Sequence, residues 1–328
     1  MKKTSLKDIA ESLGVSKALV SLVMNGKGDE RGINKETQER VREKARELNY
    51  IPNQYARGLR MGKTNTLGVI VPDISNPFYA QLCKAIEVEA GIAGFSIIIC
   101  NTFEDTKKER KLIADLLNRS IDGFILASSF DSANEIESLK LSDFPVVLVD
   151  RTFESVEMDA VSVDNFKGAQ KAVQYLYNKG ATKIACLTIS PVYISSISQR
   201  IKGYLSAVNN EFDAKLIQIR HDKITEDTIK AGNELIDKEY DGVFCVNNTI
   251  AKGLLVYMSR NNVPNDKFKI VSFDDNEVFD IVGPKVNSIC QPIDEMGKKA
   301  VELLINKIEN TDIQTSTNLV LETELKER

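Results

Sequence analysis

Hydrophobic residues recur with two different periods along this chain of 328 residues. In the first fifty residues they are spaced three and four apart, as in Leu6, Ile9, Ala10 and Leu13, which is the period of an amphipathic helix. From Leu67 onwards, short continuous apolar runs alternate with longer amphipathic segments, a pattern typical of buried parallel strands joined by helices. The pattern therefore predicts a small all-helical region followed by a long α/β region.

Three short helices are predicted in the first fifty residues. Ser5 begins the first with a capping-box pattern and Gly14 ends it, while Ser16 begins a second helix that closes at residues 25–26. A third helix is predicted from residue 35 to about residue 49. Two short helices joined by a three-residue turn that contains glycine form a helix-turn-helix pattern, which favours DNA binding. A generic three-helix bundle or a protein-docking module is the alternative.

The α/β region predicts parallel sheets covered by helices, because strands and helices alternate repeatedly along it. Two successive α/β units would make a body with two lobes. Helices are predicted at about residues 77–93, 106–119 and 294–310. A further helix is predicted to end at residue 178, and two others are predicted to begin at residues 198 and 225. The predicted strands and the terminal apolar stretch lie within residues 67–73, 95–101, 122–128, 145–151, 160–165, 183–190, 215–221, 242–248, 268–275, 287–292 and 318–325.

Residues 50–63, with the sequence YIPNQYARGLRMGK, connect the two regions. Pro52 cannot continue the preceding helix, and Gly62 and Lys63 stand just before the first apolar strand. Residues 53–60 have room for only two helical turns, which are too short to be stable alone in water. We therefore expect a connector that folds conditionally.

Charge is distributed unevenly between these regions. Residues 1–63, here called the head, carry 14 lysines and arginines against 8 acidic residues, a net charge of +6. The rest of the chain, here called the body, carries 29 against 39, a net charge of −10, and the two values sum to the −4 of the whole chain. A basic head on an acidic body favours binding of nucleic acid by the head alone.

The sequence contains few residues suited to catalysis or metal binding. Its five cysteines are far apart and lie mostly in apolar runs, so we expect free buried thiols rather than disulfides or a metal site. The single histidine, His221, has no metal-ligand spacing around it and argues against a histidine-based catalytic triad. We therefore expect neither an enzyme nor a bound metal or cofactor.

Export and membrane insertion both require hydrophobic segments. No apolar run approaches the ~18 residues of a membrane helix. Lys7, Asp8 and Glu11 interrupt the apolar core that a signal peptide would need. We therefore expect a cytoplasmic protein without a membrane partner.

An ordered series of motifs runs through nearly the whole chain. The head contains LKDIAESLGVSKALVSLVMNGK and KETQERVREKARELNYIPNQYARGL, followed by KTNTLGVIVPDISNPFYAQL at the start of the body. The series continues through DGFILAS, VVLVDR, VSVDN, QRIKGY, VSFDD and CQP. Together these motifs resemble the LacI/GalR family of bacterial transcription regulators. The resemblance implies an all-α helix-turn-helix head and a bilobed α/β body with parallel sheets, similar to periplasmic binding proteins.

The resemblance also implies that the second helix of the head enters the major groove of double-stranded operator DNA. By motif position, Lys17 and Ala18 would lie at base edges, with Leu22 one turn further on. Leu22 departs from the arginine that many relatives carry, so we expect an operator different from the commonest consensus. The positions expected to contact phosphates, which fix register rather than sequence, are Ser16, Ser21 and Asn25.

The connector resembles the hinge helix of this family, here at about residues 53–60. In a homodimer it would pair with its twin in the minor groove, with Leu59 as an apolar wedge between base steps and Ala56 beside it. Asn53 and Arg57 are the other DNA contacts expected on this helix, and Arg57 would face phosphates. The alternative role for Leu59 is that of a core residue in a short surface helix.

Polar side chains stand just beyond the ends of several predicted strands, where ligands bind in open α/β sheets. The strand ends point to Asp73 and Arg151, and the resemblance adds Arg200 and Gln291. Acidic, amide and aromatic groups together would suit a sugar or another polyol. Arg151 and Arg200 could also suit a sugar acid or a sugar phosphate, unless each pairs with an aspartate. The predicted effector-binding residues are Asp73, Phe78, Tyr79, Arg151, Arg200, Asn247, Asp274 and Gln291.

The motifs imply a division of the chain by function. We expect residues 1–63 to form the DNA-binding domain and residues 64–328 the effector-binding and dimerisation domain. Lobe N would comprise about 64–162 and 290–322, and lobe C about 163–289 and the C-terminus. The resemblance implies a homodimeric transcription regulator, which we expect to be a repressor. Its operator affinity would be controlled by a small-molecule effector, expected to be a sugar or sugar derivative, between the lobes.

Two other classes of protein share parts of this pattern. A periplasmic-type sugar-binding protein or receptor would have the bilobed body, but the basic helical head and the missing signal segment argue against it. A sugar-modifying enzyme with an α/β fold would need a nucleophile elbow, a metal set or a complete phosphate loop, and the sequence shows none of these. Salt-dependent duplex binding by the head would exclude the first alternative, and turnover of a sugar would support the second.

Overall fold

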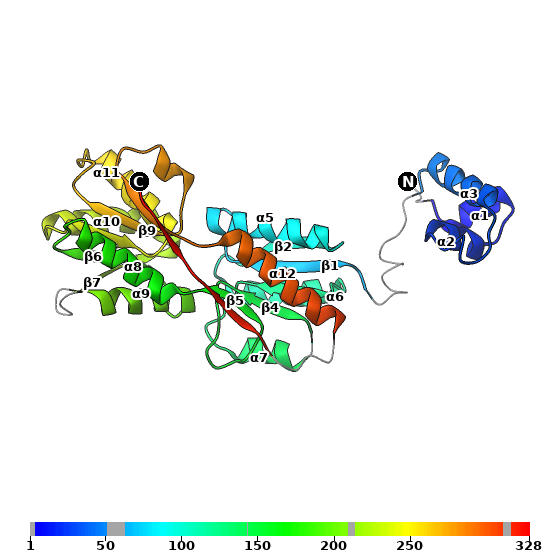
Figure 1. The fold of residues 1–328 in the computed structure, drawn as a ribbon, viewed down its shortest axis with the longest axis horizontal. Coiled ribbons are helices and arrows are strands. Elements are labelled where there is room, and N and C mark those ends of the chain that lie inside the picture. The colour runs from blue at the N-terminus through cyan, green and yellow to red at the C-terminus, as the bar shows by residue number, and fades with distance from the viewer. Residues whose placement is uncertain (1–3, 51–62, 143, 209–213, 311–315) are drawn as a thin grey trace. The chain divides into compact units, whose positions relative to one another are not determined.

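The structure, a computed structural model, divides the chain into two compact units, Met1–Thr64 and Asn65–Arg328, for which we keep the names head and body (Figure 1). It describes residues 4–50, 63–142, 144–208, 214–310 and 316–328.

The head is built from three helices around a small apolar core. The capping box predicted at Ser5 is present, because the Ser5 hydroxyl accepts from the Asp8 backbone N–H while the Asp8 carboxylate accepts from the Ser5 N–H. Gly14 ends the first helix in the left-handed region, with a φ of +64° that glycine adopts at little cost. The helices are α1 (Leu6–Leu13), α2 (Lys17–Met24) and α3 (Lys35–Glu47). Their buried core consists of Ile9, Ala10, Val20, Val23, Val41 and Ala45.

The first of two six-stranded sheets in the body is entirely parallel. Its strand order is β11-β5-β4-β3-β1-β2. The strands β3, β4 and β5 are buried along their whole length, which explains their continuous apolar sequences. The strands are β1 (Thr66–Val71), β2 (Ser96–Asn101), β3 (Gly123–Leu126), β4 (Val146–Val149), β5 (Ala160–Val163) and β11 (Asn318–Leu321).

The second sheet has the order β12-β10-β9-β8-β6-β7. All its pairs are parallel except β12, which runs antiparallel to β10. The chain therefore passes from one sheet to the other after β5 and after β11, and β10 is followed by a helix on the first sheet. The strands are β6 (Ile184–Ser190), β7 (Lys215–Arg220), β8 (Gly242–Cys245), β9 (Lys269–Phe273), β10 (Val286–Cys290) and β12 (Glu324–Lys326).

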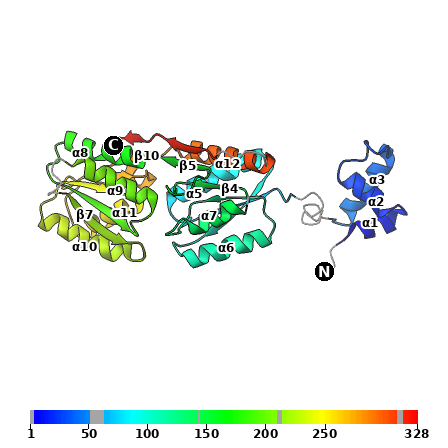
Figure 2. The ribbon, with the colours of Figure 1, turned by 90° about the horizontal axis from the view of Figure 1, so that it is seen from below.

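Helices cover these sheets (Figures 1 and 2). The helix α12 packs against α5 and against β3, β4 and β5, although it follows a strand of the second sheet in sequence. In the other half of the body, α8 packs against α9 and α10 against α11. The helices of the body are α5 (Pro77–Ile92), α6 (Thr106–Asn118), α7 (Asn134–Leu141), α8 (Asn165–Asn178), α9 (Ser195–Ala207), α10 (Ile224–Asp237), α11 (Asn248–Arg260) and α12 (Ile293–Glu309), with 3-10 helices at His221–Lys223 and Glu277–Asp280.

Two predicted helix boundaries differ from the structure by more than one residue. The third helix of the head ends at Glu47, because Asn49 takes a left-handed φ of +48°. The helix expected from residue 198 begins at Ser195 instead. Ile194, at its N-cap position, makes no side-chain cap hydrogen bond, so the sequence carries no start signal there.

Many hydrophobic residues of the body are buried in its core. Among the helices of the described residues, none has both the length and the apolar sequence needed to cross a membrane. The five cysteines are free thiols, as predicted, and Cys83, Cys186 and Cys245 are buried.

Candidate functional site

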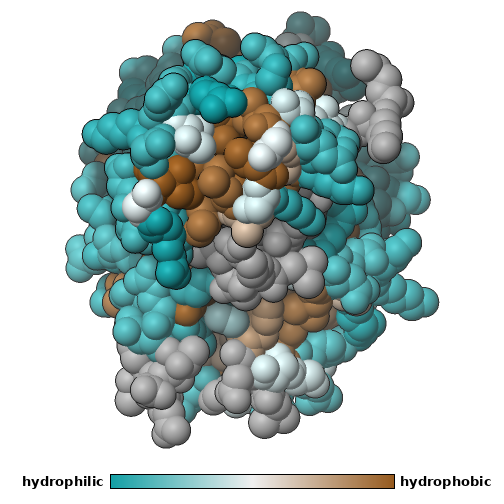
Figure 3. All heavy atoms as spheres, turned by 90° about the vertical axis from the view of Figure 1, so that its right-hand side faces the viewer, coloured by the Kyte–Doolittle hydropathy of each residue, from teal (hydrophilic) through white to brown (hydrophobic). Residues whose placement is uncertain are grey.

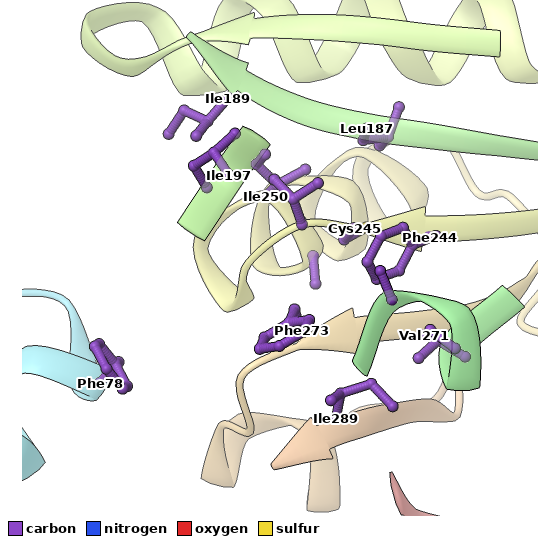
Figure 4. Packing of buried hydrophobic residues seen from close by; sticks show 14 of the residues in the cluster. Phe78, Leu187, Ile189, Ile197, Phe244, Cys245, Ile250, Val271, Phe273 and Ile289 are labelled. Atoms are coloured by element: carbon purple, nitrogen blue, oxygen red, sulfur yellow. The ribbon is translucent and has the colours of Figure 1, made fainter. Parts of the chain in front are cut away.

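One cavity in the body is lined by residues that follow the carboxyl ends of strands from both sheets. Because strands of one parallel sheet end at the same edge, residues distant in sequence meet there. Figure 4 shows part of the buried hydrophobic core, with Phe78 of α5 lying across from Phe273. Of the residues labelled there, Phe78, Ile189 and Ile197 also line the cavity. The charged and amide residues that line the cavity are Asp73, Asn76, Glu104, Asp150, Arg151, Arg200, His221, Asn247 and Asp274.

Seven of the eight predicted effector-binding residues line this cavity, and Gln291 is the exception. Gln291 lines a neighbouring hollow, which shares Phe78 and Asp274 with the cavity. Its amide Nε2 donates a hydrogen bond of 2.6 Å to Asp274 Oδ1. The structure thus gives Gln291 a contact that orients Asp274, while effector contact by any of the eight residues stays a prediction.

Arg151 is held in the cavity wall by a two-pronged ion pair with Glu104. Its Nη1 and Nη2 donate to the two carboxylate oxygens at 2.8 and 2.7 Å, and Nη1 also donates to the Ser128 carbonyl at 3.0 Å. Although burial opposes ionisation of Glu104, the Arg151 charge holds the pKa of Glu104 below its usual range. Burial likewise disfavours the charged form of Arg151, but the negative groups around it keep its pKa well above the ordinary value.

Asp150 lies beside this ion pair. Its Oδ2 accepts a 2.9 Å hydrogen bond from the Tyr79 hydroxyl and lies 3.8 Å from Arg151 Nε. That Nε atom is buried and has no hydrogen-bond partner among the described residues. Burial raises the pKa of Tyr79 well above its ordinary value, so the phenol stays a donor. The cavity wall therefore combines a hydrogen-bonded carboxylate with a guanidinium whose Nε–H has no hydrogen-bond partner among the described residues.

Arg200 is fixed from the other side of the cavity. Its Nε donates to Asn165 Oδ1 and its Nη1 to the Val246 carbonyl, both at 2.8 Å. The guanidinium lies 3.6 Å from the ring centroid of Phe273 and its Nη1 is 3.7 Å from Asp274 Oδ2. Burial raises the pKa of Asp274, and the nearby Arg200 charge opposes that rise. Stacking and hydrogen bonds thus fix the guanidinium plane.

Three acidic residues of the cavity adopt a left-handed backbone. The φ angles are +58° at Glu104, +64° at Asp150 and +67° at Asp274. Such angles are uncommon outside glycine and persist where surrounding contacts over-determine them, often at functional sites. The backbone positions of these three acidic residues are therefore held by the surrounding structure.

Glu104 and His221 line the cavity without having been predicted. Glu104 follows β2 and His221 follows β7, so the strand-end rule that found Asp73 would have found both. In sequence, Glu104 lies next to Asp105, which caps α6, and so resembles an ordinary helix-start charge.

Glu109 supports the cavity from behind. Its carboxylate accepts from the Ser128 hydroxyl at 2.8 Å and from the Ser129 N–H at 2.7 Å, and the carbonyl of Ser128 accepts from Arg151. Burial raises the pKa of Glu109 to about 7, although these hydrogen bonds act to lower it.

No group of three or more possible metal ligands occurs among the residues that the structure describes.

In the head, the predicted base-contacting residues lie on α2. Lys17 and Ala18 are exposed in its first turn, and Leu22 is half-buried one turn further on. An exposed first turn leaves these side chains accessible to a partner.

The predicted phosphate-contacting residues shape the ends of α2. The Ser16 hydroxyl accepts from the Leu19 N–H at 3.1 Å, and Asn25 Nδ2 donates to the Ser21 carbonyl at 2.6 Å. The predicted hinge helix lies outside the described residues, and with it the candidates Asn53, Ala56, Arg57 and Leu59.

Two protein-family models match the sequence. The model described as "Bacterial regulatory proteins, lacI family" matches residues 5–53. The model described as "Periplasmic binding proteins and sugar binding domain of LacI family" matches residues 64–326, which is most of the chain.

Individual proteins are similar over nearly the whole length. The HTH-type transcriptional regulator RegA of Clostridium saccharobutylicum is 33% identical, over 99% of this chain and 98% of that protein. The ribose operon repressor of Halalkalibacterium halodurans is 31% identical, over 95% of this chain and 92% of that protein. Among solved structures, a LacI family transcriptional regulator from Enterococcus faecalis with bound ribose is 30% identical. It covers 80% of this chain and 97% of its own, with a TM-score of 0.72.

Proposed function

Because the chain belongs to the LacI family of bacterial transcription regulators, we propose that it is a repressor whose binding to operator DNA is controlled by a carbohydrate effector. The effector would bind in the cavity at the carboxyl ends of the two sheets. The observation that carries this proposal is the convergence of seven predicted residues, from segments far apart in sequence, on that one cavity.

The DNA-binding part of the proposal rests on the head. The α2 helix would enter the major groove, with Lys17 and Ala18 at base edges and Leu22 following them. The net charge of +6 on residues 1–63 would supply the phosphate attraction. The proposed phosphate contacts on α2 are Ser16, Ser21 and Asn25, and the proposed contacts of the hinge helix, at about residues 53–60, are Asn53, Ala56, Arg57 and Leu59.

The effector part rests on the chemistry of the cavity. Carboxylates such as Asp73 and Asp274 accept hydrogen bonds from sugar hydroxyls, and Asn247 can both donate and accept. Phe78 and Tyr79 offer apolar surface to the hydrophobic side of a sugar ring. Bound ribose in the Enterococcus faecalis structure supports a sugar as the ligand class.

Homodimerisation is part of this proposal, because two heads would read a pseudo-palindromic operator. Val88 and Ile92 on α5 and Ile99 on β2 are exposed hydrophobic residues, 47%, 77% and 39% accessible, on elements that pack together. Figure 3 shows a side of the molecule on which hydrophobic residues also gather between hydrophilic ones, without identifying these three residues. Exposed apolar patches often mark interaction surfaces.

The proposed mechanism follows from this division of labour. Residues 1–63 would bind DNA, and residues 64–328 would bind effector and dimerise, with lobe N at about 64–162 and 290–322. Lobe C would comprise about 163–289 and the C-terminus. Effector binding would change how the lobes close and so the pairing of the hinge helices. The effect of effector on DNA affinity must equal the effect of DNA on effector affinity.

We further propose that the protein works in the cytoplasm, where operator DNA is found, and that it is not an enzyme. The relatives RegA and the ribose operon repressor are regulators, which supports this view.

The proposal is tested with the full-length protein and a duplex selected from a randomised pool. Fluorescence anisotropy compares the selected duplex with a scrambled one, at several salt concentrations, with and without ribose. We expect affinity at least roughly a thousandfold higher for the selected duplex, a steep salt dependence, and a change on adding sugar. Equal affinity for both duplexes would refute the DNA-binding function. Sugar binding without DNA binding would favour the receptor alternative, and turnover of the sugar would favour the enzyme.

A further inference from the structure

The two guanidinium groups of the cavity already have partners. Arg151 directs both Nη atoms at the carboxylate of Glu104, at 2.8 and 2.7 Å. Arg200 lies 3.7 Å from Asp274 and has its Nε and Nη1 engaged in hydrogen bonds. Both arginine side chains are less than a tenth exposed, at 8% and 3%. A ligand that enters the cavity therefore meets guanidinium groups whose charge is balanced.

Carboxylates outnumber cations around the cavity. Two arginines and four carboxylates line the cavity, together with the imidazole of the single histidine, His221. A phosphate or carboxylate on the ligand would add a further negative charge to this wall. One uncompensated repulsion between unit charges at ~6 Å, in surroundings of moderate polarity, weakens binding by roughly 100-fold. The four carboxylates are those of Asp73, Glu104, Asp150 and Asp274.

We propose that the cavity selects an uncharged sugar and that Glu104 is the residue that excludes phosphorylated and carboxylated sugars. The proposal rests on the proposed function, which supplies the premise that the cavity binds a carbohydrate. Glu104 acts by occupying Arg151, whose planar pair of Nη donors would otherwise fit two oxygens of a phosphate or carboxylate. The hydroxyl groups of an uncharged sugar do not compete with Glu104 for Arg151, because they can donate hydrogen bonds to the carboxylates of the cavity.

The backbone places Glu104 in this position. Phe103 and Glu104 are consecutive left-handed residues, with φ of +56° and +58°, which turn the loop after β2 towards Arg151. The turn is held by a 2.8 Å hydrogen bond from the Phe103 N–H to the Pro72 carbonyl and a 3.3 Å hydrogen bond from the Glu104 N–H to Thr102 Oγ1. A strained and hydrogen-bonded turn of this kind fixes its side chain, so Glu104 belongs to the built wall of the cavity.

The first test compares charged and uncharged sugars of the same skeleton on the full-length protein. Isothermal titration uses ribose, ribose 5-phosphate and ribonate, and then glucose, glucose 6-phosphate and gluconate. We expect an uncharged sugar to bind and its phosphate and acid to bind at least roughly 30-fold more weakly. Binding of either anion as tightly as its uncharged counterpart would overturn the proposal.

The second test does not depend on knowing the effector. Glu104→Gln removes the carboxylate that accepts from both Nη atoms of Arg151. Nη1 keeps its hydrogen bond to the Ser128 carbonyl, and Asp150 remains as a counter-charge, 3.8 Å from Nε. Inorganic phosphate should then bind and raise the melting temperature of the variant. Wild-type protein in the same phosphate series, with ionic strength held constant by sodium chloride, should show no such rise. An equal response of the two proteins would contradict the role of Glu104.

Two variants serve as controls. Glu135 forms an ion pair with Arg110 on the protein surface, so Glu135→Gln also frees an arginine, but a hydrated one. Its melting temperature should respond to phosphate as the wild type does. Glu104→Asp retains the charge and should also respond as the wild type does. If Glu104→Gln does not fold, the sugar series on the wild type still decides, because binding of an anionic sugar as tightly as its uncharged counterpart overturns the proposal.

The two tests separate this proposal from the proposed function. If no sugar binds but only Glu104→Gln responds to phosphate, the carbohydrate effector is wrong and the charge selection by Glu104 stands. If a sugar binds and both proteins respond equally to phosphate, the carbohydrate effector stands and the role of Glu104 is wrong.

Discussion

Replacement of Glu109 by glutamine offers a quantitative test of the polar support behind the cavity. Glu109 is fully buried, and its carboxylate accepts two hydrogen bonds, from the Ser128 hydroxyl and the Ser129 N–H. Burial raises its pKa from the ordinary 4.5 to about 7. Glutamine has nearly the same shape and can keep both contacts, with its carbonyl on Ser129 and its amide on the Ser128 oxygen, but it cannot ionise.

The sign of the effect follows from the direction of the pKa shift. In the unfolded chain the Glu109 carboxyl loses its proton near pH 4.5, whereas in the folded protein it does so near pH 7. The contribution of Glu109 to the free energy of unfolding is therefore largest below pH 4.5, and it falls progressively as the pH rises to about 7. At 1.36 kcal/mol for each pKa unit, the loss amounts to about 3 kcal/mol. Glu109→Gln escapes this loss, so its stability relative to wild type should grow by about that amount between pH 4.5 and 8.

Urea unfolding, followed by circular dichroism at pH 4.5 to 8, measures the difference between the two proteins. Other titrating groups occur in both and largely cancel in that difference. The control is Glu137→Gln, which changes an exposed carboxylate on α7, where charge carries no burial penalty. A difference between Glu109→Gln and wild type that stays constant with pH, or that falls as the pH rises, would refute the assignment of the pKa shift to burial.

Three further predictions concern packing, capping and DNA binding. In Gly203→Ala, the new Cβ would lie 2.3 Å from the Phe166 carbonyl oxygen where α9 meets α8, so we expect destabilisation by about 2 kcal/mol or more in urea unfolding. Gly91→Ala is the control, because a Cβ there meets nothing within 4 Å, and equal effects of the two would contradict the packing argument. Ser5→Ala removes the capping box of α1 and should cost the head about 1 kcal/mol in thermal unfolding, whereas an unchanged midpoint would show that the cap contributes nothing. Leu59→Ala should lose specific operator affinity in anisotropy titrations while keeping most non-specific binding, and equal loss of both would reject the wedge role.

The fold was predictable wherever a local signal determines a local structure. Ser5, Gly14 and Ser16 carry capping signals whose hydrogen bonds depend on neighbouring residues alone, and all three act as predicted. The start of α9 had no such signal, because Ile194 stands at the cap position. This helix packs against α8, a tertiary contact that the spacing in the sequence does not encode.

The membership of the cavity was largely predictable, because the parallel strand order brings strand ends together regardless of loop detail. Asp73, Arg151 and Asp274 follow strand ends and line the cavity as expected. The pairing of these residues was not predictable. The sequence offers an aspartate as the partner of Arg151, whereas the bidentate partner in the structure is Glu104, 47 residues earlier in the chain.

The ion pair between Arg151 and Glu104 changes the class of ligand that Arg151 is expected to favour. A free guanidinium at a strand end favours an anionic ligand, and the sequence alone left sugar acids and sugar phosphates open for that reason. The two left-handed residues at Phe103 and Glu104 reverse this expectation, because they deliver a carboxylate to the guanidinium before any ligand arrives. An arriving anion would have to displace Glu104 from a strained, hydrogen-bonded turn and leave its charge without a partner, whereas a neutral sugar needs no rearrangement. The loop conformation after β2, more than the number of arginines, therefore sets the charge of the ligand that we expect.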